Sequence, residues 1–470
     1  MKNITLLTGL LLTITTCSNA QVLFGDTYLG GTGNGVLFNY NTVTGRDSVD
    51  FAFNNTDGAS PNYLSGVMQA TDGMLYGTAS SGGSAIHGVM YRFNPVTGKD
   101  TVLINFDGPK YGSAPYGSLI QCTDGLLYGM TNAGGASGDG VLYSYDPVTL
   151  KDSIRLTFNN TVSRGGYPYG PLLQAKDGYI YGMNSGGGIG GSGVLFRFDP
   201  KTNNDTILYA FPSSTSGPRG GLIQGTDGLL YGLTIHGGSS DDGTIFSYDP
   251  VKFKDSVRLS LDGSKGDYPW GNLVQAANGK MYGMTYNDAV NFSGVLFCFN
   301  PVNNSDSVVV WFKTATGIHP YGTPIICSNG LLYGLTYNGG TSNYGTLFSY
   351  NMTTGSIATL LNFNSTTNGA NPAGILLEVN GLPLAVNNIV RQAHIAVYPN
   401  PFHGATNIVF AEDGKHYLEV DDITGRQIEA MECIDKQYEL QRNNLAPGIY
   451  FIKAFDQEHN YIATSKIVVE

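Results

Sequence analysis

The chain has 470 residues, of which 65 are glycine and 30 are tyrosine, and only 13% are charged. Its formal net charge of −11 disfavours nucleic acid and anionic membrane surfaces as partners, so we predict no nucleic-acid binding. The glycines recur at fixed offsets inside apolar, aromatic-rich runs, without a capped helical period. The composition therefore indicates a packed all-β protein rather than a low-complexity chain.

The first 20 residues have the features of a secretory signal. A basic start precedes the apolar run Ile4–Ile14, and a small-residue pattern ends at Ala20. We predict a signal peptide over residues 1–20 with cleavage between Ala20 and Gln21. Cys17 leaves a lipoprotein site as an alternative, which the two threonines before it make less favourable. Because no other apolar run approaches the ~18 residues of a membrane helix, we predict no transmembrane segment.

A longer sequence pattern recurs in seven copies which, aligned on an aromatic-glycine pair, are spaced by 52, 52, 53, 50, 51 and 51 residues. The copies are Phe24-Gly25, Tyr76-Gly77, Tyr128-Gly129, Tyr181-Gly182, Tyr231-Gly232, Tyr282-Gly283 and Tyr333-Gly334. A fixed period of this length is typical of solenoids and propellers.

One copy, residues 115–158, contains four short apolar runs, which we name strands A to D: Leu119–Cys122, Leu126–Thr131, Val141–Tyr145 and Ser153–Phe158. An Asp-Gly pair favours a tight hairpin between A and B, and an Asp-Pro turn separates C from D. Each repeat is therefore predicted to form a four-stranded antiparallel meander.

The two ends of the repeat region complement each other. The first copy begins directly in a B strand at residues 22–27, whereas an unpaired A strand, residues 372–379, follows the last copy. Pairing of these segments would close a ring, and the polar caps of a linear solenoid are missing. We predict a seven-bladed β-propeller of four-stranded antiparallel blades over residues 21–381.

The loops from D to A carry the candidate ligand-binding residues. Strand A is innermost in a propeller, so the residue between Pro and Gly in "PYG", "PRG" and "PWG" should surround the channel mouth. These positions are Tyr116, Tyr169, Arg219, Trp270 and Tyr321. Aromatic rings there could stack on sugars, and Arg219 could hold a carboxylate or hydroxyl. The alternative is that these side chains only cover the ends of strand A.

Catalytic and metal-binding patterns are weak. Titratable residues occur in the long loops, at His87, His236, His319, Asp139, Asp241, Asp242, Asp267 and Asp288, but no spacing forces them together and no nucleophile motif accompanies them. The cysteines after the signal, Cys122, Cys298, Cys327 and Cys433, have no metal-like spacing. We therefore predict no catalytic residue, no metal site, no cofactor and no disulfide framework.

A triplet Asp-Ser/Thr-apolar opens strand D in six copies. It resembles the O-glycosylation sequon of Bacteroidota, and this resemblance implies glycans on Ser48, Thr101, Ser153, Thr206, Ser256 and Ser307. The same triplet is also compatible with a simple Asx-type turn at the start of a strand.

The repeat pattern also resembles a known class. An apolar run, Tyr-Gly, a Gly-Gly pair and then Gly-Val-Leu-Phe are similar to the tandem Gloeo-Verruco (GloVer) repeats of bacterial exported proteins, and more distantly to kelch blades. The resemblance implies a propeller and defines no catalytic residue.

After Gly381 the period stops. We predict a linker over residues 382–393 and a small β-sandwich over residues 394–470. The latter resembles the C-terminal sorting domain of the type IX secretion system of Bacteroidota, in the residues Tyr398, Pro399, Asn400, Pro401, Gly425, Gly448, Tyr450 and Lys466. Asp421-Asp422 departs from that family's apolar-aromatic pair.

The resemblance of the C-terminal segment implies interaction with the type IX machinery, export, removal of the domain, and either release or surface attachment. We expect a monomeric, secreted or cell-surface binding module for a glycan or protein ligand. A propeller-fold polysaccharide lyase or hydrolase and a structural surface component are the alternatives, because propellers host unrelated functions.

Overall fold

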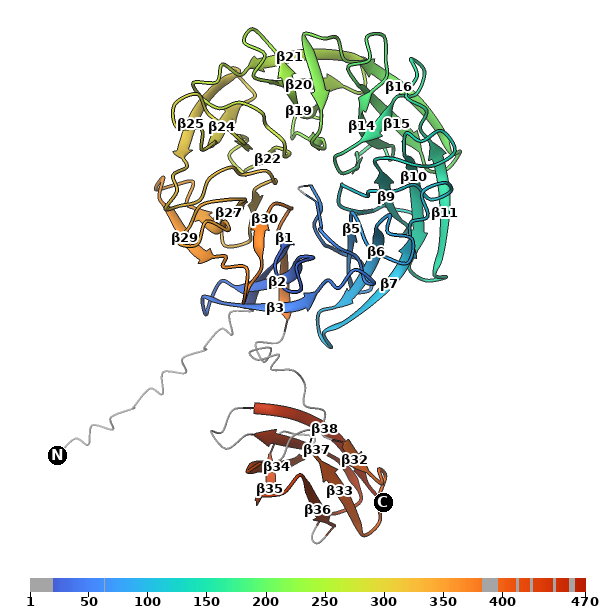
Figure 1. The fold of residues 1–470 in the computed structure, drawn as a ribbon, viewed down its shortest axis with the longest axis vertical. Helices are drawn as coiled ribbons and strands as arrows, with labels where there is room; N and C mark the ends of the chain where they lie inside the picture. Colours follow the sequence, from blue (N-terminus) through green and yellow to red (C-terminus); the bar gives the residue numbers. More distant parts are fainter. Residues whose placement is uncertain are drawn as a thin grey trace, which may run out of the picture. The chain divides into compact units, whose positions relative to one another are not determined.

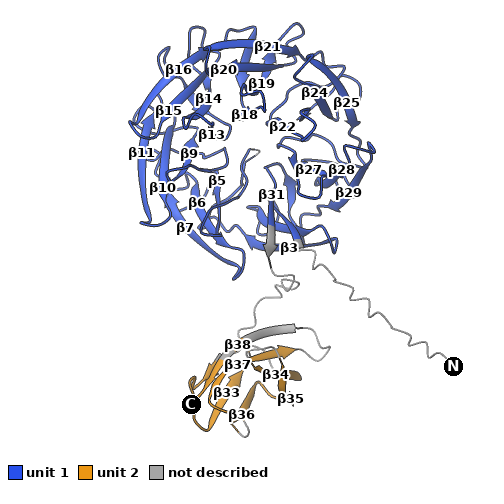
Figure 2. Cartoon of the chain, turned by 180° about the vertical axis from the view of Figure 1, so that it is seen from behind, with its two compact units in different colours: residues 1–384 blue, residues 385–470 orange. Residues whose placement is uncertain are grey.

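The computed structural model describes residues 20–62, 64–382, 396–410, 414–422, 426–442, 445–455 and 461–470. The chain divides into two compact units, Met1–Leu384 and Ala385–Glu470 (Figure 2). The predicted signal peptide before Ala20 and most of the predicted linker lie outside the described residues.

The first unit is a ring of sheets around a central axis (Figure 1). Within residues 20–62 and 64–382 there are seven antiparallel sheets, each with a four-stranded blade. From the inside outward, the first four blades are β31(Leu377–Leu382), β1(Ala20–Leu29), β2(Val36–Asn41), β3(Arg46–Ala52); β4(Met68–Gln69), β5(Leu75–Ala79), β6(Val89–Asn94), β7(Lys99–Asn105); β8(Ile120–Gln121), β9(Leu127–Thr131), β10(Val141–Asp146), β11(Lys151–Thr157); β13(Leu173–Gln174), β14(Ile180–Gly186), β15(Val194–Asp199), β16(Asn204–Ala210).

The remaining blades are β18(Ile223–Gln224), β19(Leu230–Gly237), β20(Thr244–Asp249), β21(Lys254–Ser260); β22(Val274–Gln275), β23(Met281–Thr285), β24(Val295–Asn300), β25(Ser305–Trp311); β26(Ile325–Ile326), β27(Leu332–Thr336), β28(Thr346–Tyr350), β29(Ile357–Asn362). Three D-to-A loops add short strands that pair with strand B, which the sequence did not predict: β12(Gly166–Pro168), β17(Thr215–Pro218) and β30(Ala370–Pro372).

The repeated Asp-Gly pair forms the hairpin between strands A and B. In the third blade Gly125 has a left-handed φ of 84°, and the Leu126 N–H donates to Asp124 Oδ1 at 3.1 Å. The buried Tyr128 hydroxyl donates to the other oxygen of Asp124 at 2.8 Å. The Tyr of the Tyr-Gly pair is therefore a core side chain whose hydroxyl is satisfied by the turn.

In four blades a glutamine at the end of the short A strand links neighbouring blades. Gln174 accepts from the Thr123 N–H at 2.8 Å and donates to Gly178 O at 3.1 Å, so it joins the turn of the preceding blade to the turn of its own. Gln121, Gln224 and Gln275 make the same two bonds.

Apolar side chains fill the spaces between adjacent blades. Between the second and third blades, Tyr76 and Met90 pack against Leu127, Val141 and Tyr143 in one buried cluster. Comparable clusters occupy the other interfaces, so each sheet buries both faces only because the ring supplies a neighbour on each side.

The chain ends meet in the first blade. Strand β31 pairs with β1, with Val379 opposite Val22 and Leu377 opposite Phe24. The pairing strand lies at Leu377–Leu382 rather than at 372–379, because residues 370–372 form β30 at the other end of β1. Gln21 reinforces the seam, since its side chain bonds Glu378 and accepts from Asn329 Nδ2 at 2.8 Å.

The second unit is a small β-sandwich. One sheet has the order β32(Ala396–Tyr398), β33(Ala405–Val409), β36(Gln437–Gln441); the other has the order β35(Gln427–Cys433), β34(His416–Asp422), β37(Gly448–Phe455), β38(Tyr461–Val469). Ile408 and Leu440 of the first sheet share a core with Leu418, Val420 and Ile452 of the second. The predicted sandwich is therefore present.

Candidate binding site at the channel mouth

The D-to-A loops hold the candidate mouth residues through an unusual backbone turn before each proline. The residue there has a left-handed φ of 50–67° in all seven loops: Ser60, Ala114, Tyr167, Gly217, Tyr268, His319 and Asn371. Its N–H donates to a B-to-C loop carbonyl of the preceding blade, as Tyr167 does to Asp139 at 2.9 Å. Such turns persist only where surrounding contacts determine them, so each loop is fixed by its neighbour.

Only glycine fits directly after these mouth residues, because the backbone of the next blade leaves no room for a Cβ atom. A Cβ on Gly170 would lie 2.2 Å from the carbonyl oxygen of Gly220, and one on Gly220 would lie 2.3 Å from that of Gly271. The same relation connects Gly117, Gly271, Gly322 and Gly374 to the next blade. We name these six residues the glycine ring. It brings the D-to-A loops into backbone contact and thereby places the preceding side chains beside one another.

The five predicted residues form one continuous arc. The rings of Tyr116 and Tyr169 stack with their centroids 5.3 Å apart, and the Arg219 guanidinium lies 4.4 Å from the centroid of Tyr169. On its other side Arg219 lies 4.5 Å from the centroid of Trp270, whose ring contacts Tyr321 edge-on at 5.7 Å. All five side chains are half-buried, so the arc is both packed and accessible.

A small cavity opens at this arc. It has a volume of about 120 Å³ and is lined by Asn62, Leu64, Tyr116, Tyr169, Arg219 and Trp270. Tyr321 does not line the cavity and instead extends the arc beyond Trp270. Leu64 and Ala373 occupy the equivalent position in the two remaining D-to-A loops, and they are buried, with 2% and 1% exposure.

Sequence reasoning missed several neighbours of the arc. Asn62 belongs to a loop with two additional residues before its mouth position, and Tyr286, Tyr337 and His319 continue the aromatic cluster. Tyr286 lies 4.5 Å from Tyr321 and 4.6 Å from His319, between ring centroids. The sequence contained a clue to Tyr286 and Tyr337, because "GMTY" and "GLTY" place a Tyr at the end of strand B in two adjacent blades.

The fold brings three of the acidic loop residues, Asp242, Asp267 and Asp288, close enough for their charges to interact. Burial, followed by the charges of Asp242 and Asp288, raises the pKa of Asp267 to about 6. Asp288 is buried, and its carboxylate accepts four backbone N–H groups of its own loop, from Val290, Asn291, Ser293 and Gly294. Asp288 thus maintains the loop conformation. Among the described residues no cluster of three or more His, Cys, Asp or Glu could hold a metal ion.

The cysteines of the described chain are internal. Cys122, Cys298, Cys327 and Cys433 are all buried and unpaired with one another. Burial is the largest cause of the raised pKa of the Cys298 thiol, which favours its neutral form. These residues are packing side chains of three blade interfaces and of the sandwich core.

The sorting-motif residues fasten the first strand of the sandwich to the last. Asn400 Oδ1 accepts from the Val468 N–H at 2.8 Å, and the Thr406 hydroxyl donates to Pro399 O at 2.7 Å. Tyr450 donates to Ala446 O at 3.0 Å. The departing residue Asp421 is buried and pairs with Lys453 at 2.5 Å. Gly425 lies outside the described residues.

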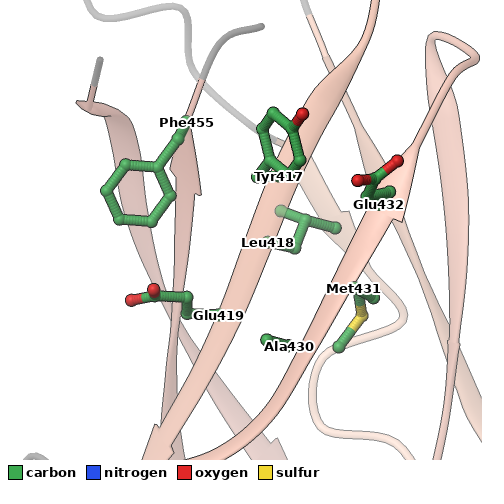
Figure 3. A pocket seen from close by; sticks show the side chains of 7 residues that line it. All are labelled: Tyr417, Leu418, Glu419, Ala430, Met431, Glu432 and Phe455. Carbon is green, nitrogen blue, oxygen red and sulfur yellow. The ribbon is translucent and has the colours of Figure 1, made fainter. Parts of the chain in front are cut away.

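The sandwich also carries an open hollow of about 380 Å³ on one sheet (Figure 3). Tyr417, Leu418 and Glu419 of β34 lie between Phe455 of β37 and a segment of β35, Ala430–Glu432. Lys415 stands beside it, 3.0 Å from the carboxylate of Glu432. This hollow belongs to the C-terminal unit, and sequence reasoning did not identify it.

The six predicted glycosylation hydroxyls lie on outermost strands, where Ser153, Thr206 and Ser307 are exposed and Ser48, Thr101 and Ser256 are half-buried. If all six carry glycans, the exported protein should be heavier than its bare chain, and alanine at the exposed positions should remove mass in steps. Intact-mass spectrometry measures this, and a mass equal to the bare chain would contradict the prediction.

From residue 16 to 217 and again from 168 to 389, the sequence matches the Gloeobacter/Verrucomicrobia repeat. The chain belongs to this repeat family. Residues 396–470 match the secretion system C-terminal sorting domain. The predicted repeat class and sorting domain are thereby confirmed, and this repeat protein is exported to the cell surface or secreted. The described part of the chain contains no helix with the length and apolarity that a membrane crossing needs.

Solved structures show the same fold at low identity. A candidate 6-phosphogluconolactonase from Bacteroides uniformis is 17% identical with a TM-score of 0.54, over 77% of this chain and 100% of that one. The periplasmic gluconolactonase of Pseudomonas aeruginosa is 18% identical with a TM-score of 0.52, over 77% and 99%. These likenesses confirm the predicted all-β propeller class and concern the fold alone. No curated protein matches the sequence.

Proposed function

We propose that this exported repeat protein binds a glycan at its channel mouth. The arc of Tyr116, Tyr169, Trp270 and Tyr321 carries the proposal, because four blades each contribute a half-buried aromatic ring to one surface. Sugar rings present C–H faces that pack on aromatic faces, and a concave site with few polar groups is the usual form of a small-ligand site.

The rigidity of the mouth supports binding over a mere covering of strand ends. The glycine ring and the left-handed residues before proline fix all these loops, so little conformational entropy remains to be lost when a ligand binds. A covering role would require only that the rings be buried, whereas Tyr116, Tyr169 and Trp270 are half-buried and line a cavity.

The test is a glycan array probed with the full chain and with Trp270→Ala and Tyr169→Ala. We expect each substitution to weaken binding of a captured glycan about 10-fold or more, roughly 1.4 kcal/mol, because a stacking face is lost. Trp311→Ala is the matched control, since Trp311 lies at the end of the outermost strand β25 and is 37% exposed. It should bind as the wild type does.

Unchanged binding in both mouth variants would contradict the proposal. Capture of proteins but of no glycan would place a protein ligand at the mouth instead. Shortened products from a captured polysaccharide would replace the binding role by a lyase or hydrolase activity.

A further inference from the structure

Arg219 is a cation in a packed aromatic site, and no described residue supplies its counter-ion. The guanidinium carbon lies over the rings of both Tyr169 and Trp270, 4.4 and 4.5 Å from their centroids. Among the described residues it makes no ion pair and no hydrogen bond, and its buried Nε has no partner. Arg164 shows the contrast, since its guanidinium pairs with Asp205 at 3.0 Å.

This environment restricts how Arg219 can be satisfied. A guanidinium packed against two aromatic rings can still donate hydrogen bonds, because its N–H groups all lie in its own plane and point outward from its edge. The two rings also displace water from the cation, so an anion at that edge gains more than it would in bulk water. The fork of N–H groups matches a carboxylate in two parallel bonds.

The cavity and the overall charge limit the size and charge of the anion. About 120 Å³ is below the usual volume of a small-ligand pocket, so it admits one end of a saccharide rather than several residues. A net charge of −11 repels a polyanion, as do Asp267 in the loop of Trp270 and Asp242, whose carbonyl accepts from Tyr268 in that loop. An otherwise neutral saccharide with a single negative charge at its end satisfies both the limit on size and the limit on charge.

We propose that the mouth selects saccharides ending in one sugar acid, whose carboxylate binds the in-plane edge of Arg219 while its ring packs on Tyr116, Tyr169 or Trp270. This inference rests on the proposed glycan binding and names the ligand class. Arg219 would discriminate between saccharides with acidic and with neutral terminal sugars. The aromatic residues would supply the affinity that both kinds of saccharide share.

The test compares ligands that differ only at the terminal carboxyl. Neutral oligosaccharides ending in glucose or galactose are measured beside their glucuronate- and galacturonate-ended counterparts and the methyl esters of those acids, by calorimetry on the full chain. We expect a free acid to bind at least 10-fold more tightly than its ester or neutral counterpart. In Arg219→Gln this preference should disappear, whereas Arg219→Lys should keep part of it.

The possible outcomes distinguish failure of the sugar-acid proposal from failure of the proposed glycan binding. Equal binding of acid, ester and neutral ends would overturn the sugar-acid assignment and leave glycan binding standing. Binding of no saccharide would overturn both. Tighter binding of polygalacturonate than of a single acidic end would overturn the single-charge argument, and capture of peptides through a free C-terminal carboxylate would overturn the sugar class. Because the ester comparison uses wild-type protein, folding defects in a variant cannot imitate the result.

Discussion

Asp26→Asn is expected to stabilise the protein, and to do so more at pH 8 than at pH 5. Asp26 lies on β1, at the position where five of the other blades carry Met or Leu. It is 2% exposed, and the Ser65 hydroxyl donates to it at 3.1 Å. Burial raises its pKa from 3.8 to about 7, against the lowering effect of the Ser65 bond.

The direction of the pH effect follows from this raised pKa. A carboxyl that is harder to ionise in the folded state contributes its full stability below the unfolded pKa of 3.8, and that stability is lost as the pH rises towards 7. With these two values the loss is on the order of 4 kcal/mol at pH 8 and about 1.5 kcal/mol at pH 5. An amide cannot ionise and avoids this loss.

The measurement is the thermal midpoint of wild type and variant at both pH values and one scan rate. The gain should be larger at pH 8 by roughly 3 °C for a propeller of this size. Burial also raises the pKa of Asp50 to about 7, so only the difference between variant and wild type reports Asp26. Ser65→Ala should act in the opposite direction at pH 8. An equal gain at both pH values would refute the assignment to Asp26.

Gly322→Ala is expected to destabilise the propeller by about 3 kcal/mol or more. Its Cβ would lie 2.1 Å from the carbonyl oxygen of Gly374 and 2.6 Å from that of Ala373. These atoms belong to the backbone of the next blade, so no flexible side chain can move aside, and overpacking against a fixed neighbour is costly. The clash would open the seam between the seventh and first blades.

Chemical denaturation or a thermal scan of the full chain measures this cost. Gly190→Ala is the matched control, because its φ is ordinary and its nearest neighbour, Ser192 Oγ, would be 4.0 Å from the new Cβ. The control should lie within about 0.5 kcal/mol of wild type. Similar stability of the two variants would mean that the glycine ring does not require glycine.

Local signals in the sequence were enough to predict the blade. The Asp124-Gly125 turn, the buried Tyr128 and the fixed period are properties of one repeat, and short-range turn chemistry and strand alternation specify them without knowledge of the neighbours. The phase of the chain ends likewise predicted that β1 would receive its inner strand from residues 372–379, a range that overlaps β31 only from Leu377 on.

The mouth shows where that reasoning was incomplete. The sequence identified its aromatic positions from the order of strands in a blade, but no role was predicted for the glycine after them. In the structure a side chain is excluded at that position, because a Cβ on Gly220 would clash with the carbonyl of Gly271, about 50 residues away in sequence. No repeat examined alone contains that contact.

The sequence by itself determined the all-β repeat, its four-strand unit, the sorting domain and the candidate mouth positions, because each depends on residues close together in the chain. Only the tertiary structure decided that Arg219 lies between Tyr169 and Trp270 with no counter-ion among the described residues, and that Asp26 is buried beside Ser65. Those environments arise when a closed ring brings loops of different blades to one axis, and a fixed period carries no information about the distances between them.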